Sequence, residues 1–448
     1  MKQRGPAKPE PKTERVSQLY ALLFGGFLGL TIIKFGNVAI FESLVTWPEN
    51  RWEWALNPWP VAIGYVLLAI LAILGIAVAR WEIRGPKWLL FLPLAWLIWQ
   101  FLAATQSVDA TLTRATLKHF TGCGLCFYLG YFAIGRAHNP LSFLTGLILA
   151  MALVIATGLE QHFGGLERTR HYFYTYLYPQ MTSVPPEYLQ KMSSDRIWGT
   201  LFYPNSLAGV LLLLLPMTLA ASLQHFTRLT LGARQFVSAV FAGGGLACLF
   251  WSGSKGGWLL MLVLGLIALL QAPFAKRWKW LLVGAVCVAG LAGFGVKYAD
   301  FFRRGATSVS ARVDYWEAAA RTAIRNPIVG TGPGTFAIPY QKIKRPESEM
   351  AKLTHNDFLQ QASDSGLPGF GMFTVFVWGC MLLTKPRTRA DKLGWIRFAI
   401  WLGLLGWWLQ GFLEFGLYVP ALAWPGFALS GWLLANSGKR MDKANPGD

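Results

Sequence analysis

The sequence predicts an all-α polytopic membrane protein with about 12 transmembrane helices. Of its 448 residues, 54% are hydrophobic and only 14% are charged, and the mean hydropathy is +0.39. A soluble domain carries roughly a quarter charged residues. The apolar residues also gather in runs of about twenty, which is the length of helix that crosses roughly 30 Å of hydrocarbon.

The predicted spans are joined by connections whose charge predicts their orientation. RWEIRGPK, GRAHNP, AKRWK and TKPRTRADK are all basic, and lysine and arginine in short loops favour the cytoplasmic side of a membrane. Both termini are therefore expected in the cytoplasm. The apolar runs lie at 17–34, 59–79, 88–104, 116–135, 141–162, 201–223, 235–252, 257–272, 279–296, 357–383, 395–416 and 419–436.

These runs divide the chain into five parts. Residues 1–16 and 437–448 are expected to form cytoplasmic tails, the first of them disordered. About nine spans occupy 17–296, and about three occupy 357–436. Between them, residues 297–356 are expected to form a large loop on the outer side that carries a polar helix.

Composition and spacing exclude several other classes. The net charge of +19 does not indicate nucleic-acid binding, because the basic residues form neither one tail nor one face. All five cysteines lie in apolar runs, so no disulfide framework is expected. No zinc-binding spacing such as H-E-x-x-H occurs, and no D-x-D motif lies in an early outside loop. We therefore expect neither a metal nor another cofactor.

The loop helix is predicted over 311–325, with Ser310 as its N-cap. At helical spacing Arg312 and Trp316 share one face, whereas Arg321 and Arg325 share another. A guanidinium group held at a membrane surface suits phosphate recognition, because it donates two parallel hydrogen bonds to one phosphate. A solvated surface helix is the alternative.

A glycine-rich turn, VGTGPGTF, follows this helix. Gly330, Gly332 and Gly334 alternate in it, so its backbone is able to approach another backbone or a ligand closely. The turn is not a Walker loop, because the Gly-Lys-Ser/Thr ending is missing.

His355 lies where the loop enters the next span, in THNDFLQQ. An imidazole at that position is both accessible to a hydroxyl acceptor and partly shielded, which suits a general base near neutral pH. Asn356 or Asp357 could orient its ring, and Asp357 could instead cap the following helix. A structural role for a single interfacial histidine is the alternative.

Two charged residues lie at span ends on the same predicted outer side. Lys255, in FWSGSKGGWL, would bind an anionic ligand or snorkel to the interface. Glu414, in QGFLEFGLY, would pair with a loop arginine or reach water, and the residues alone favour a structural role for it.

Four segments, taken in order, resemble the signatures of the O-antigen ligase superfamily. They are GTLFYPNSLAG at 199–209, SGSKGG at 252–257, SARVDYWEAAARTAIRNPIVGTGPGTF at 310–336 and THNDFLQQASDSGLPGFG at 354–371. That family includes O-antigen ligases, related O-antigen polymerases and bacterial O-oligosaccharyltransferases. The order of the motifs and the number of spans match over most of the chain.

The resemblance implies a lipid-dependent glycosyltransferase fold of the GT-C-like type, in which a large periplasmic loop covers a cavity open to the bilayer. It also implies a multi-pass protein of the bacterial inner membrane with its active site on the periplasmic side. The donor would be a glycan on undecaprenyl pyrophosphate, transferred with neither a metal nor a nucleotide sugar. The acceptor would be a saccharide, lipid A core or protein, and a monomer is the expectation.

The resemblance also implies roles for individual residues. Arg312 matches the loop arginine that grips the pyrophosphate, and His355 matches the family's base. Lys255 stands where the family usually has arginine, so the charge is kept while the bidentate fork is lost. Arg196 is a further candidate for donor binding. Supporting roles are expected for Asn356, Asn205, Trp316, Gly330, Gly332 and Glu414.

The predicted reaction is an inverting displacement in which the base takes a proton from an acceptor hydroxyl and cations stabilise the departing pyrophosphate. A polymerase of the same superfamily is the first alternative. A transporter or flippase of lipid-linked glycans is the second, and it would require buried charges at the midplane and broken helices.

Overall fold

The computed structural model describes residues 11–135, 140–180, 189, 193–272, 274–303, 307–346, 348–386 and 392–437. Within these ranges the regular structure is helical and no strand occurs, which confirms the predicted all-α class. The tails predicted at 1–16 and 437–448 fall largely on 1–10 and 438–448, outside the described residues.

Each of the predicted apolar runs forms a helix. In the described part of the chain, eight helices are long and apolar enough to cross a membrane on their own, and α11 is a shorter apolar helix. The protein is thus a polytopic membrane protein, while twelve spans remain a prediction. The helices are α1 Pro11–Lys34, α3 Val61–Val78, α4 Lys87–Ala104, α5 Ala110–Tyr128 continued by η2 Leu129–Ile134, α6 Pro140–Glu160 continued by η3 Gln161–Gly165, α9 Pro204–His225, α10 Leu231–Ser252, α11 Lys255–Gln271, α12 Lys276–Arg303, α15 Asp357–Leu383, α16 Lys392–Gln410 and α17 Pro420–Ser437.

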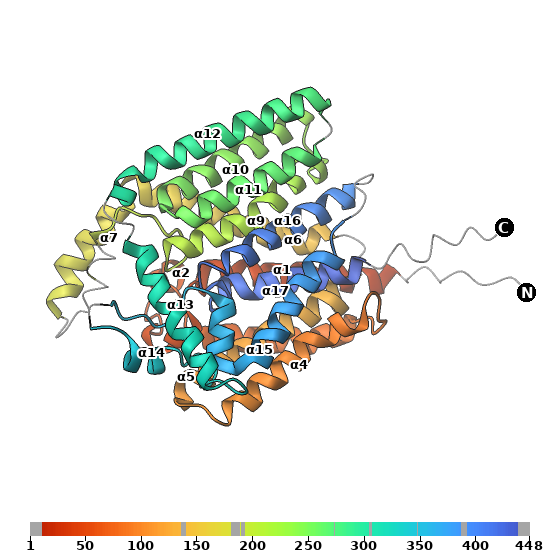
Figure 1. Cartoon of the computed structure of the whole chain (residues 1–448). Helices are drawn as coiled ribbons and strands as arrows, with labels where there is room; N and C mark the ends of the chain where they lie inside the picture. The colour runs from red at the N-terminus through yellow and green to blue at the C-terminus, as the bar shows by residue number, and fades with distance from the viewer. Residues whose placement is uncertain are drawn as a thin grey trace, which may run out of the picture.

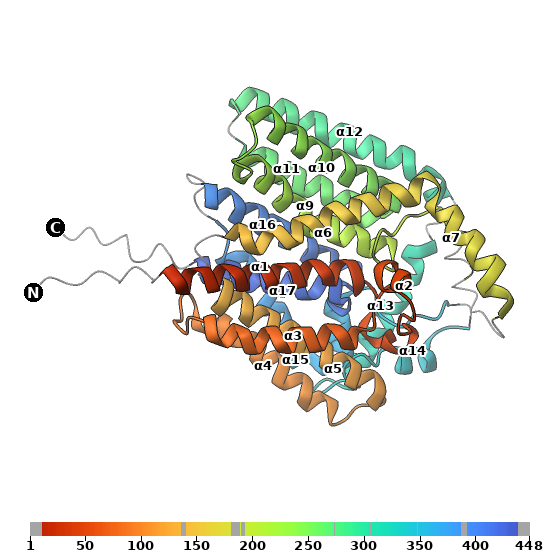
Figure 2. The same ribbon diagram turned by 180° about the vertical axis from the view of Figure 1, so that it is seen from behind.

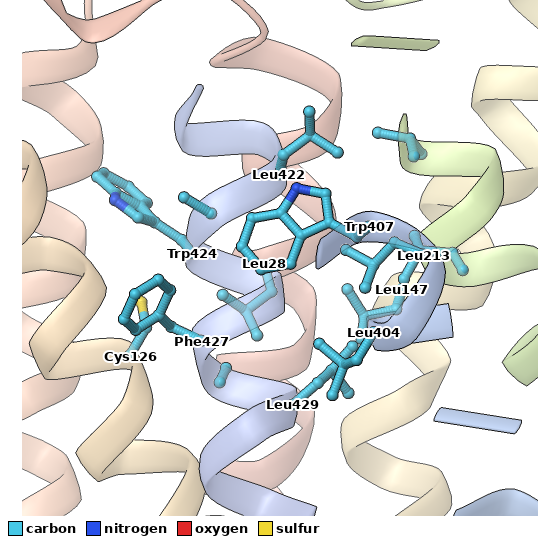
Figure 3. Packing of buried hydrophobic residues seen from close by; sticks show 14 of the residues in the cluster. Leu28, Cys126, Leu147, Leu213, Leu404, Trp407, Leu422, Trp424, Phe427 and Leu429 are labelled. Carbon is cyan, nitrogen blue, oxygen red and sulfur yellow. The ribbon is translucent and has the colours of Figure 1, made fainter. Parts of the chain in front are cut away.

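Helix α17 lies at the centre of the bundle. It is buried from Pro420 to Asn436, as expected for a helix that is apolar on all sides. Figure 3 shows Trp407 of α16 lying beside Leu422 of α17, with Leu28 of α1 nearby. Packing around α17 therefore holds together helices that are far apart in sequence.

The polar segments gather at one end of the bundle, which we call the loop end. Helices α2, α7, α13 and α14 lie there, opposite the end at which α1 begins (Figures 1 and 2). The last turn of α17 lies beside the end of η2, where the Asn436 side chain donates to the Gly135 carbonyl at 3.0 Å. The loop-end elements are η1 Ala39–Leu44, α2 Arg51–Leu56, α7 Leu166–Tyr172, η4 Phe173–Leu177, η5 Tyr178–Gln180, α13 Thr307–Arg325, α14 Ala337–Ile343 and η6 Gly416–Tyr418.

Several helix boundaries differ from those predicted. Helix α1 begins at Pro11, so 11–16 of the predicted disordered tail are helical, and α16 ends at Gln410, before the predicted end of its span at 416. Helix α12 runs on to Arg303, past the predicted end of its span at 296, and Lys297 in this extension lies over the Phe250 ring, 3.2 Å from its centroid. Helix α13 begins at Thr307, so Ser310 lies within its first turn and is not its N-cap.

Helix α15 is broken where the loop docks on it. Ser365 (φ −129°, ψ 15°) and Gly366 (φ 70°, ψ −177°) leave the helical conformation. A side chain at Gly366 would place a Cβ atom 2.1 Å from the Ile328 carbonyl oxygen, so only glycine fits. The Leu367 amide donates to the Pro327 carbonyl at 2.8 Å. This contact fixes the end of α13 against the bundle.

Candidate active site

A cavity of about 590 Å³ lies at the loop end, between α13 and the ends of α9, α11 and α16. Its walls come from four parts of the chain that are far apart in sequence. Six of the predicted site residues line it, namely Arg196, Asn205, Lys255, Arg312, His355 and Glu414.

Glu414 is at the centre of this group. It lies in the turn after α16, and only 8% of its surface is exposed. Its Oε1 accepts from Arg312 Nη2 at 2.5 Å and from Asn205 Nδ2 at 2.6 Å, and its Oε2 lies 3.1 Å from His355 Nδ1. Burial raises the pKa of Glu414, but His355, Arg312 and Arg196 outweigh that effect and hold the pKa below its usual value. The carboxylate is therefore ionised at neutral pH.

His355 is held in an unusual backbone conformation. Its φ is +51°, and it is the one non-glycine residue with a positive φ in the described part of the chain. Such strain persists only where the surroundings hold the residue in place. The ring lies between Tyr315 and Phe415, at centroid distances of 6.0 and 4.8 Å. With Nδ1 donating to Glu414, the tautomer leaves Nε2 as a proton acceptor.

Neither neighbour of His355 orients its ring in the structure. The Asn356 side chain caps α15 by accepting from the Phe358 and Leu359 amides, both at 3.0 Å. Asp357 accepts from the Leu417 amide at 3.0 Å instead. Asn356 is thus the helix cap that the sequence suggested at Asp357, and the carboxylate beside the ring comes from Glu414, 59 positions away.

Three cationic side chains face the cavity. Arg196 donates from Nε to the Ser252 carbonyl at 2.7 Å and from Nη2 to Asn205 at 2.8 Å. Arg312 bonds to Glu414 from Nη2, and its buried Nε has no partner in the described part of the chain. Asn205 therefore links two of the three cations through Glu414.

Lys255 supplies the third cation. It begins α11, just before the apolar stretch from 257 onward, and its Nζ lies 3.8 Å from the Phe301 ring centroid. Burial, together with repulsion from Arg196 and Arg312, lowers the pKa of Lys255 to about 8. Three cations thus face one buried acid, Glu414, and one exposed acid at the rim, Glu349. An anionic ligand would relieve this repulsion.

Trp316, Gly330 and Gly332 do not line the cavity. Trp316 packs beside Tyr315 in a small hydrophobic cluster under α13. A Cβ on Gly330 would lie 2.4 Å from the Asp364 backbone, and one on Gly332 would lie 2.4 Å from Ser107 Oγ. The glycine-rich turn packs against the backbone of Asp364 and the side chain of Ser107, so Gly330 and Gly332 contribute to docking of the loop.

Asp364 completes that docking, although no motif in the sequence pointed to it as a functional residue. It is fully buried at the break in α15 and accepts from the Gly334 amide and from Gln360 Nε2, both at 2.8 Å. The Gly332 amide donates to its carbonyl oxygen at 2.8 Å. In the sequence, an acidic residue directly before Ser365 and Gly366 within the apolar run 357–383 is the signal that could have marked Asp364 as functional.

No group of three or more His, Cys, Asp or Glu residues that could hold a metal ion occurs in the ranges the structure describes. The arrangement instead provides a carboxylate-oriented imidazole beside a cluster of cations. A helical membrane protein with such a cavity has the groups for acid–base chemistry on a phosphate-bearing substrate.

Residues 237–374 match the family model described as O-Antigen ligase. The match contains Lys255, Arg312 and His355, while Arg196, Asn205 and Glu414 lie outside it. This match supports the O-antigen ligase superfamily that the motifs predicted. The family implies a glycosyltransferase-like enzyme of the ligase and polymerase type. No curated protein matches the sequence of this chain.

Proposed function

We propose that the protein is an O-antigen ligase-like glycosyltransferase. It moves a glycan from an undecaprenyl-pyrophosphate carrier to an acceptor hydroxyl, with inversion and without a metal. The observation that carries this proposal is the Glu414–His355 pair, 3.1 Å apart, beside three cations in one cavity. The reaction is assigned to the periplasmic face of a bacterial inner membrane, with both termini in the cytoplasm.

The proton follows a short path. Glu414 accepts from His355 Nδ1, which leaves Nε2 to take the proton of the acceptor hydroxyl. The hydroxyl oxygen then forms a bond to the anomeric carbon as the bond from that carbon to the pyrophosphate oxygen breaks. The bonding pair leaves on the pyrophosphate, and attack from the opposite side inverts the anomeric configuration. The ionised Glu414 stabilises the imidazolium that forms.

The charge on the leaving group is met by Arg312, Lys255 and Arg196. Donors aimed at charge that develops in the transition state act strongly in a partly buried site. Within the described structure the Arg312 side chain donates a hydrogen bond to Glu414 alone, so its guanidinium retains donors for a phosphate. An anion that enters the cavity would offset the repulsion that Arg196 and Arg312 exert on Lys255.

Reconstitution tests this function. Purified protein in liposomes, given a polyprenyl-pyrophosphate-linked glycan and a saccharide acceptor, is expected to transfer the glycan in excess chelator. The matched control is His355→Asn, because asparagine also tolerates positive φ. A strict requirement for added divalent metal, or full activity of the asparagine variant, would overturn the proposal.

Acceptor identity separates ligase from polymerase. A deletion strain that accumulates long chains on the carrier lipid indicates a ligase, whereas loss of all long chains indicates a polymerase. Lipid A core, another saccharide and a protein hydroxyl are the acceptors to compare in that assay.

A transporter or flippase is less well supported. Helix α15 is broken at Ser365 and Gly366, which is one feature of such proteins. The break packs against Pro327 and Ile328 rather than against the cavity. Its buried Asp364 accepts hydrogen bonds from the docked loop. The break therefore serves to hold α13 against the bundle. The charged groups of the cavity lie at the loop end, whereas a transporter would require them at the midplane.

A further inference from the structure

Helices α3, α4 and α5 enclose a second hollow, which the proposed reaction does not use. This α3–α5 groove has a volume of about 570 Å³, and most of its wall is apolar. Leu68 of α3, Phe101 of α4, and Leu117 and Leu125 of α5 are among the residues that line it. Phe101 is half exposed and Leu125 is more than a third exposed, so the groove opens at the outer surface of the bundle.

Two cations face this apolar groove. Arg114 and Lys118 lie one helical turn apart on α5, and both are exposed. Helix α5 begins at Ala110, so a rise of 1.5 Å per residue places their Cα atoms about 6 and about 12 Å along it from the loop end. Charged side chains in such surroundings are costly unless an anion or water meets them.

The two cations differ in their ion pairing. Lys118 Nζ donates to Glu42 Oε1 at 3.0 Å, whereas Arg114 has no ion pair in the described part of the chain. Asp109 is engaged as the cap of α5, accepting from the Thr111 and Leu112 amides. None of the described residues that line the groove is acidic. Arg114 therefore lies at the mouth of an apolar groove with no carboxylate paired to it in the described part of the chain.

We propose that the α3–α5 groove binds an anionic phospholipid of the surrounding bilayer. Arg114 and Lys118 contact its phosphate, and one acyl chain lies along the wall formed by Leu68, Phe101 and Leu125. Basic pockets between transmembrane helices bind anionic headgroups in this way. The apolar wall favours a lipid over a free phosphate ion, because a phosphate ion has no apolar surface to bury against it.

The position of the groove connects it to the loop. Thr113, on the same helix, donates from Oγ1 to the Pro333 carbonyl at 3.1 Å in the glycine-rich turn. On another face of α5, His119 Nε2 bonds to the Leu417 carbonyl at 2.7 Å. A lipid that holds α5 therefore stabilises the helix on which the docked loop rests. This inference does not depend on the proposed glycosyl transfer.

Native mass spectrometry of the full-length protein in detergent tests the proposal, with phosphatidylglycerol as the anionic probe and phosphatidylcholine, whose zwitterionic headgroup has no net charge, as the comparison. Arg114→Gln with Lys118→Gln is expected to weaken phosphatidylglycerol binding about tenfold, since each basic residue near a lipid phosphate contributes about 1 kcal/mol and Lys118 is shared with Glu42. Arg114→Lys with Lys118→Arg should restore binding. Glu42→Gln should strengthen it, because the variant frees Lys118.

The matched control is Lys276→Gln with Lys279→Gln at the exposed start of α12, which removes the same charge away from the groove. Equal binding of phosphatidylglycerol and phosphatidylcholine would overturn the proposal. So would a loss of phosphatidylglycerol binding in this control as large as the loss in the Arg114 and Lys118 double variant. Stabilisation by inorganic phosphate alone, or displacement of phosphatidylglycerol by less undecaprenyl phosphate, would likewise overturn the assignment to a phospholipid. If the double variant does not fold, Glu42→Gln and Arg114→Gln alone still decide, because their expected effects have opposite signs.

Discussion

The carboxylate of Glu414 joins Arg312 to His355, accepting from the arginine on Oε1 and from the imidazole on Oε2. One buried acid thus neutralises part of the cationic charge of the cavity and orients the imidazole of His355. In the proposed reaction, Glu414 stays beside the imidazole when Arg312 turns toward the pyrophosphate. The two halves of the proposed reaction are therefore linked through a single side chain.

Replacing Glu414 with glutamine should separate these roles. Glutamine keeps the size of the side chain, but it removes the charge that stabilises the imidazolium. We expect kcat to fall by about 100-fold or more, with a smaller change in the KM for the donor. Steady-state transfer kinetics measure both quantities.

The charge-matched control for that variant is Glu317→Gln. Glu317 pairs with Arg321 at 2.5 Å on another face of α13 and does not line the cavity. An unchanged kcat for Glu414→Gln would contradict the pairing as a catalytic feature.

His355 should be sensitive to substitution in two distinct ways. Both His355→Ala and His355→Asn should lose about 100- to 10,000-fold in rate, because neither side chain takes a proton near neutral pH. Only alanine should also lower the Tm, since asparagine tolerates the φ of +51° better. Thermal unfolding in detergent checks this, and equal Tm values for the two variants would argue against backbone strain at this position.

Lys255 should cause an alkaline decline in activity. Its folded-state pKa is lowered to about 8, so the protonated cation is lost as the pH rises through that value. If the cation binds the donor, kcat/KM should be about tenfold lower at pH 9 than its plateau near pH 7. Bound pyrophosphate favours the protonated form, so the decline in kcat should lie at higher pH.

Lys255→Arg provides the control for the pH profile. Arginine stays charged throughout this range, so the alkaline decline should disappear from the kcat/KM profile. A decline that persists in this variant would assign it to another group.

Gly330 should be required for docking of the loop. It has a φ of +67°, and an added Cβ would lie 2.4 Å from the Asp364 backbone. Gly330→Ala is expected to cost about 2 kcal/mol or more, from strain at positive φ and from displacement of the turn. A lowered Tm with reduced transfer would report the loss.

Gly371→Ala is the control within α15, where an added Cβ meets nothing within 4 Å. It should be neutral or stabilising by up to about 1 kcal/mol, because alanine favours helix over glycine. If both alanine variants unfold at the same temperature, the turn does not depend on the close approach at Gly330.

The sequence by itself determined the class of protein, the positions of its helices and the family. Hydropathy is a local property that adds up along a segment, so apolar runs such as 357–383 predict a helix without knowledge of its neighbours. The motifs at 252–257 and 310–336 are each one unbroken stretch of sequence. A local pattern is therefore enough to mark Lys255 and Arg312 as candidate site residues.

Only the tertiary structure decided which partners these residues have. Glu414 lies 59 positions from His355, 102 from Arg312 and 209 from Asn205, so no local pattern indicates that it contacts all three. From the sequence, Gly330 could allow close approach of either a ligand or another part of the backbone. The structure shows that the neighbour is the backbone of Asp364. A hydrogen bond depends on the position of both groups in space, and for these residues that position is set by helices that meet only in the folded bundle.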